Sequence, residues 1–132
     1  MRLEHLGIAV ADLPAARELY TRLLDTAPYK EERVEDQGVT TLFFQTGESK
    51  VELLEATRPD SPIAKFLDAR GEGIHHVAFE VADIRAEMAR LAAAGFQLLQ
   101  EEPAIGADDK WVCFVHPKSA GGVLVELCQS RA

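Results

Sequence analysis

The hydrophobic and polar positions form a pattern that the chain contains twice. In "HLGIAV" and again in "HVAFEV" apolar residues fall at every second position, which is typical of a strand with one buried face. Aligning His5 with His76 also aligns "VADL" (10–13) with "VADI" (81–84), at a constant offset of 71 residues. The pattern therefore predicts two copies of one module.

Each copy continues with a helix and further strands. Asp12 and Asp83 are the expected N-caps of helical stripes at 13–24 and 84–92, because a short acidic side chain there accepts an unpaired backbone N–H. The expected strands are 29–35 (weakly signalled), 39–44 and 50–54 in the first copy, and 96–100, 111–115 and 123–128 in the second. Each copy therefore reads βαβββ.

The two copies are joined by a segment that has its own helical signals. Ser61 is a candidate N-cap, Pro62 suits the first helical position and Gly71 follows the expected end. The length of 132 residues fits one compact domain. We predict a single α+β domain over 1–132, with module one at about 1–57, a helical connector at about 58–72 and module two at about 73–132.

Composition and charge narrow the class of protein. The formal net charge is −8, so nucleic acid and anionic membrane surfaces are poor partners. The chain contains no apolar run of membrane-spanning length and no basic-then-apolar leader. Cys113 and Cys128 lie in apolar, strand-like runs, where reduced core thiols are common. We expect a soluble protein of the cytoplasm.

Two histidines and two glutamates stand out as candidates for chemistry. Small residues alternate with each histidine in its strand, which leaves a hollow on that face, and each last strand places one glutamate between apolar residues. Burying such a carboxylate alone costs several kcal/mol, so a compensating charge is expected. A single strand histidine is more often structural, as we expect for His75 on the opposite face, but repetition favours a metal site. Imidazole and carboxylate ligands suit Zn, Co, Ni, Mn or Fe(II). The expected ligands are His5, Glu52, His76 and Glu126.

The sequence resembles the vicinal oxygen chelate (glyoxalase/bleomycin-resistance) superfamily. Within it, the chain is similar to the methylmalonyl-CoA epimerase family through "EHLGIAV", "DSPIAKFL", "GEGIHHVAFEV", "EEPAIGA" and "FVHPKSAGGVLVEL". The superfamily resemblance implies two βαβββ modules that form a cupped, partly open mixed β-barrel with flanking helices around a divalent ion. The narrower one implies an isomerase that interconverts (2R)- and (2S)-methylmalonyl-CoA by moving a proton at C2, with Co²⁺ favoured and Zn²⁺, Ni²⁺ or Mn²⁺ possible.

The resemblance also assigns roles to individual residues. It implies that Glu126 is a metal ligand and one of the two acid–base groups that the reaction needs. Some relatives place a second glutamate at the position of Thr41, and threonine is no base, so either another group, such as Glu52 or a bound water, delivers the second proton, or the activity differs. Candidate contacts to the acyl-CoA substrate are Thr41, Lys110 and Lys118, with Lys65 and Arg70 as further candidates for the phosphates.

Two other functions remain open at this point. A glyoxalase I-type lactoylglutathione lyase shares the His/Glu/His/Glu pattern, although that family usually reads "DPDG" where this chain has "HPKSAGG". Metal-free relatives that only bind small molecules tend to lose the four ligands. Because the superfamily commonly dimerises and both modules expose strand edges, we also expect a homodimer.

Overall fold

The computed structural model describes residues 1–131. The chain forms two compact units, His5–His75 and a second unit that combines Met1–Glu4 with the chain from His76 onward. The predicted second module ends at residue 132, which lies outside the described residues. No helix of the described chain is both long enough and apolar enough to cross a membrane.

The first module consists of one helix and four strands. The chain order is β1 (Arg2–Ala9), α1 (Leu13–Leu24), β2 (Lys30–Val34), a short 3₁₀ helix η1 (Glu35–Gln37), β3 (Val39–Thr46) and β4 (Ser49–Ala56). The strands lie in the order β2-β3-β4-β1, with β1 parallel to β4 and the other neighbours antiparallel. The first and last strands of the module, β1 and β4, are therefore direct neighbours, and their side chains lie in register.

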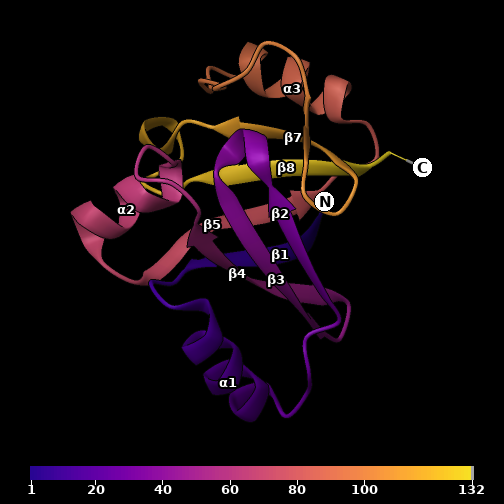
Figure 1. The fold of residues 1–132 in the computed structure, drawn as a ribbon. Coiled ribbons are helices and arrows are strands. Elements are labelled where there is room, and N and C mark those ends of the chain that lie inside the picture. The colour runs from indigo at the N-terminus through magenta and orange to yellow at the C-terminus, as the bar shows by residue number, and fades with distance from the viewer. Residues whose placement is uncertain (132) are drawn as a thin grey trace. The chain divides into compact units, whose positions relative to one another are not determined.

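The second module repeats this arrangement. Its elements are β5 (Gly73–Glu80), α3 (Ile84–Ala93), β6 (Ala104–Gly106), β7 (Lys110–Val115), a 3₁₀ helix η2 (Pro117–Ser119) and β8 (Val125–Ser130). The strands lie in the order β5-β8-β7-β6, and β5 runs parallel to β8. The helix α2 (Pro62–Arg70) connects the modules. Figure 1 shows α3 beside β7 and β8. The predicted α+β class with two βαβββ modules and flanking helices is confirmed.

The helices begin where the polar caps predict. The Asp12 and Asp83 carboxylates accept the backbone N–H groups of Ala15 and Ala86, each at 3.1 Å. The Ser61 hydroxyl caps α2 in the same way. These bonds satisfy donors that a helix leaves unpaired at its start, so each cap fixes the entry of its helix.

Each long helix packs on one face of its own strands. The α1 core joins buried residues of α1 to Leu42, Phe44 and Leu53, all from the same face of β3 and β4. The α3 core similarly uses one face of β7 and β8, which supplies Cys113, Val115 and Leu127. Because side chains alternate along a strand, the residues between these positions point to the other face of each sheet.

The strand predicted at 96–100 is wrong as a strand. This segment forms only an isolated bridge from Leu98 to Val115, and the edge strand of the module is the shorter β6. The contact of segment 96–100 with β7 is irregular, because the Gln100 side chain, rather than a backbone carbonyl, accepts the backbone N–H of Phe114 at 2.8 Å. The polar run before Pro103 therefore ends the pairing early.

Candidate metal and acid–base site

The first module brings His5 and Glu52 together. The parallel register places Glu52 opposite Gly7, two residues after His5. The His5 Nδ1 atom lies 3.0 Å from Glu52 Oε2, and each residue is only 5% exposed. Since Gly7 has no side chain, the imidazole and the carboxylate meet above it.

The second module builds the same pair in the same register. Here Glu126 lies opposite Ala78, two residues after His76. The His76 Nε2 atom lies 3.3 Å from Glu126 Oε1, and each residue is 6% exposed. The Phe114 ring, opposite Glu126 on β7, contacts the His76 imidazole edge-on with ring centres 6.0 Å apart. The sequence repeat is therefore also a repeat of register and of His–Glu pairing, although a different ring nitrogen faces the glutamate in each module.

A second matched contact helps to hold the glutamate-bearing strands in register. Three residues after Glu52, the Glu55 carboxylate accepts the backbone N–H of Leu13 at 2.7 Å. Three residues after Glu126, the Gln129 amide oxygen accepts the backbone N–H of Ile84 at 2.8 Å. Each last strand thus binds the start of its own helix with one face while it presents the glutamate on the other.

We call this other face, directed away from α1 or α3, the site face of each module. In the first module, register pairing adds Phe43 beside Glu52, and Thr41 beside Leu54. In the second module it adds Phe114 beside Glu126, and Val112 beside Cys128. Both glutamates are thus buried against aromatic and aliphatic side chains, where an ionised carboxylate is costly unless a positive charge or a donor compensates it.

These groups fit the donor chemistry of a divalent ion. Imidazole nitrogen and carboxylate oxygen are the ligands that transition metals share in proteins. The contacts in each pair hold the two side chains in defined orientations on a buried face. Each pair therefore offers one nitrogen and one oxygen ligand from a preorganised position.

Sequence reasoning missed a further buried carboxylate, that of Glu4. This residue is 2% exposed although it precedes His5 on β1. At the 71-residue offset its counterpart is His75, so the repeat gave no signal for it. Burial is the main cause of the raised pKa of the Cys128 thiol, and the negative charges of Glu126 and Glu4 raise it further. The thiol therefore stays protonated, as expected for a core cysteine.

The predicted substrate contacts lie in different settings. Thr41 is 1% exposed on the site face of the first module. Lys110 is on the site face of the second, where its Nζ atom is 2.9 Å from Ser130 Oγ and 3.7 Å from Glu80 Oε2. Lys118 is exposed in η2, Lys65 is exposed on α2, and Arg70 stacks over the Phe66 ring at 5.8 Å.

His75 has the surroundings of a structural residue. Its ring meets the Phe66 ring of α2 edge-on, with centres 5.0 Å apart. Burial lowers the pKa of His75, which favours the neutral imidazole in this contact. The first of the two adjacent histidines thus packs against the connector helix.

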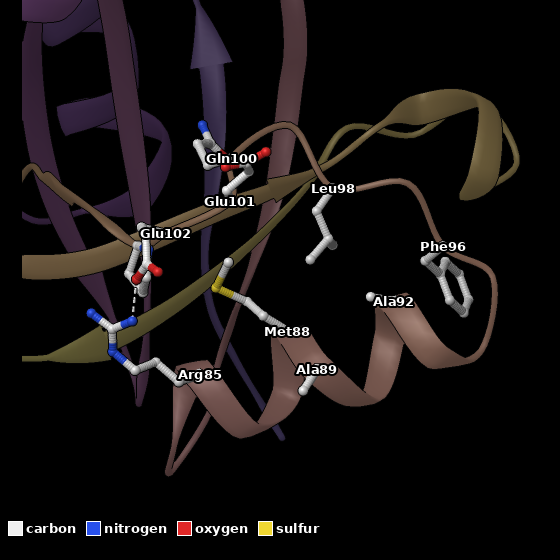
Figure 2. Close-up of a pocket in the computed structure, with 10 residues that line it drawn as sticks. Arg85, Met88, Ala89, Ala92, Phe96, Leu98, Gln100, Glu101 and Glu102 are labelled. Carbon is white, nitrogen blue, oxygen red and sulfur yellow. Dashed lines mark hydrogen bonds and ion pairs between the residues drawn. The ribbon is translucent and has the colours of Figure 1, made fainter.

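A cavity of about 500 Å³ lies elsewhere in the second module. Figure 2 shows Met88 and Leu98 directed into the space between α3 and the following segment, with an ion pair from Arg85 to Glu102 at one end. The cavity is lined by residues of α3 and of 96–103, and neither His76 nor Glu126 contributes to it. It is therefore separate from the site face.

The chain is similar to known proteins over most of its length. The chain belongs to the glyoxalase/bleomycin resistance protein/dioxygenase superfamily, whose family model matches residues 4–114. It is 45% identical over 130 residues to the ethylmalonyl-CoA/methylmalonyl-CoA epimerase of Cereibacter sphaeroides, covering 97% of each chain.

Two solved structures are similar over nearly the whole chain. The methylmalonyl-CoA epimerase of Mycobacterium tuberculosis matches with a TM-score of 0.95 and 38% identity, covering 99% of this chain and 89% of that one. A variant of the Streptomyces coelicolor methylmalonyl-CoA epimerase, in complex with 2-nitronate-propionyl-CoA, matches with a TM-score of 0.93 and 38% identity, covering 100% and 99%.

Proposed function

We propose that this protein is an isomerase that epimerises methylmalonyl-CoA at C2. The observation that carries the proposal is the matched His–Glu pair at the same register in both modules, on a chain similar to epimerases over nearly its full length. The reaction removes the C2 proton of one epimer and returns a proton to the opposite side of the same carbon. The carbon skeleton and the thioester are unchanged.

The proposed metal ligands are His5, Glu52, His76 and Glu126, with Co²⁺ as the favoured ion. Two imidazoles and two carboxylates, all buried, match the donor set of a mid-series transition metal. A divalent ion bound by them supplies the positive charge that makes a proton next to a thioester acidic enough to remove.

Glu126 is the first acid–base group of the proposal. Its carboxylate contacts the His76 imidazole, and Phe114 and Val112 cover the neighbouring site face. A carboxylate shielded from water is a stronger base than a solvated one, because burial destabilises its charged form. As a base it takes the C2 proton, and as an acid it returns one.

The acyl-CoA substrate carries phosphates that an acidic protein must meet with local positive charge. Lys118, exposed in η2, is the proposed phosphate contact, and Thr41 and Lys110 are proposed contacts on the site faces. A homodimer and a cytoplasmic location stay predictions. Size-exclusion chromatography with light scattering tests the first of these.

The test is isotope exchange at C2. The protein, loaded with Co²⁺, is incubated with (2R)-methylmalonyl-CoA in deuterated water, and mass spectrometry measures deuterium in both epimers. The expected result is deuterium uptake together with formation of the 2S epimer, both abolished by a chelator. Absence of exchange contradicts the proposal.

Two parallel measurements separate the other functions. Formation of lactoylglutathione from methylglyoxal and glutathione identifies a lyase instead. Metal analysis of the purified protein distinguishes both enzymes from a metal-free binding protein. The similarity to epimerases does not favour the lyase.

A further inference from the structure

The proposed reaction needs a second acid–base group, because a proton removed from one side of C2 must be replaced from the other side. Glu126 serves one side. In the first module, the site-face residue beside Leu54 is Thr41, and its hydroxyl is not a base at neutral pH. A carboxylate near this face must therefore serve the other side of C2.

The sheet register identifies a carboxylate directly beside Thr41. Residue Glu32 of β2 is the antiparallel partner of Thr41 on β3. Residues directly opposite each other in an antiparallel pair point to the same face, with Cβ atoms about 5 Å apart. Glu32 therefore shares the site face with Thr41, one strand further from Glu52.

Side-chain contacts support this orientation of β2. Lys30, two residues earlier on the same face, lies over the Phe43 ring with its Nζ 5.4 Å from the ring centre. Phe43 is the register partner of Glu52, so β2 reaches the row of the proposed ligand. Lys30 Nζ also lies 3.2 Å from Glu32 Oε1, an ion pair that holds the Glu32 carboxylate on this face.

The surroundings of Glu32 give it both access and support. Its side chain is 32% exposed, whereas the side chain of Glu31 on the opposite face is 54% exposed and ion-paired with Arg17. Further along the same face, Val34 and Val39 pack with the α2 helix. Glu32 thus stands between the part covered by α2 and the residues beside Glu52, with about a third of its own side chain exposed.

The second module has no counterpart of this carboxylate. The residue equivalent to Thr41 is Val112, and its partner on the edge strand β6 is Ala104. The duplicated scaffold thus carries an edge-strand carboxylate beside the site in only one copy.

We propose that Glu32 is the second proton-transfer group, an inference that rests on the proposed epimerisation. In one direction Glu126 takes the C2 proton and protonated Glu32 gives its proton to the opposite side. In the other direction the two exchange roles. One C–H bond breaks and one forms in each turnover, and the proton balance is restored by exchange of both carboxyl groups with water.

The test compares Glu32→Gln with Glu31→Gln, which removes the neighbouring carboxylate from the other face of the same strand. Each purified epimer is incubated in deuterated water, and C2 exchange and inversion are measured separately. For Glu32→Gln we expect inversion to fall by about 100-fold or more, while one epimer still exchanges its C2 proton with retention through Glu126. Glu31→Gln should invert and exchange both epimers at the wild-type rate.

Inversion at the wild-type rate in Glu32→Gln overturns the proposal. So does loss of exchange in both epimers while Co²⁺ content and the circular dichroism spectrum stay unchanged, because a one-sided defect is expected. If Glu32→Gln does not fold, Glu32→Asp provides the same test: it keeps the charge but shortens the reach, so inversion should fall more than exchange of one epimer. Absence of exchange in the wild type contradicts the proposed function instead.

Discussion

The site faces of the two modules have the same arrangement of histidine, glutamate and phenylalanine, but they differ in the neighbouring pair of residues. Both carry a histidine and a glutamate in the same parallel register, and both place a phenylalanine opposite the glutamate. The adjacent row holds Thr41 and Glu32 in the first module but Val112 and Ala104 in the second. The two copies thus share the register of the candidate ligands, and one copy carries further polar groups beside them.

The largest expected effect tests what the modules share. His5→Ala and His76→Ala each remove a proposed ligand, so each should weaken Co²⁺ binding by about 100-fold or more, beyond the effect of losing a group that only orients a ligand. Isothermal titration of the metal-free protein measures the affinity. His116→Ala, directly before η2, is the control and should keep the wild-type affinity for Co²⁺. A large loss of affinity in only one of the two ligand variants would show that the two modules do not contribute equally to metal binding.

The next effect tests how the modules differ. Glu126→Gln should lower the rate of C2 exchange by about 10²–10⁴-fold, because an amide cannot carry the proton. Glu52→Gln should cost about tenfold or less, since the amide oxygen can still act as a ligand. Rates are measured at saturating Co²⁺. Equal losses in the two variants show that the glutamates have the same role.

A smaller effect concerns the turns before β3 and β7. Gly38 has φ +64°, and a Cβ there lies 2.9 Å from Ser61 Cβ, while the turn before β7 uses Asp109 at φ 54°. Gly38→Ala should therefore lower the free energy of unfolding by about 2 kcal/mol, through backbone strain and displacement of its neighbours. Urea unfolding measures this, and Asp109→Ala, already left-handed without glycine, should cost less.

The smallest effect should be equal in the two modules. Asp12→Ala and Asp83→Ala each remove the same N-cap contact, so each should cost about 1 kcal/mol and lower Tm by a few degrees. Asparagine at either position retains an acceptor and serves as the control. A much larger loss at one cap indicates that its helix also supports the site face.

Much of this frame could be predicted from the sequence, because period-two alternation assigns side chains to faces and polar caps mark helix starts. The βαβββ repeat and the four candidate ligands follow from that logic. The strand register does not follow from it, since register depends on turn geometry and packing. The weakly patterned "YKEERVE" segment therefore gave no sign that Glu32 lies opposite Thr41. The strand expected at 96–100 failed for a related reason, because a side-chain bond from Gln100 replaces ladder pairing.

The parallel pairing of first and last strand in each module has a consequence for how the site arises. The histidine and the glutamate of a pair come from opposite ends of a module, so neither pair exists in a fragment that lacks the last strand. During synthesis the amino-terminal half can complete its own ligand pair before the carboxy-terminal half has left the ribosome. Metal uptake would then report, stage by stage, how far tertiary folding has progressed.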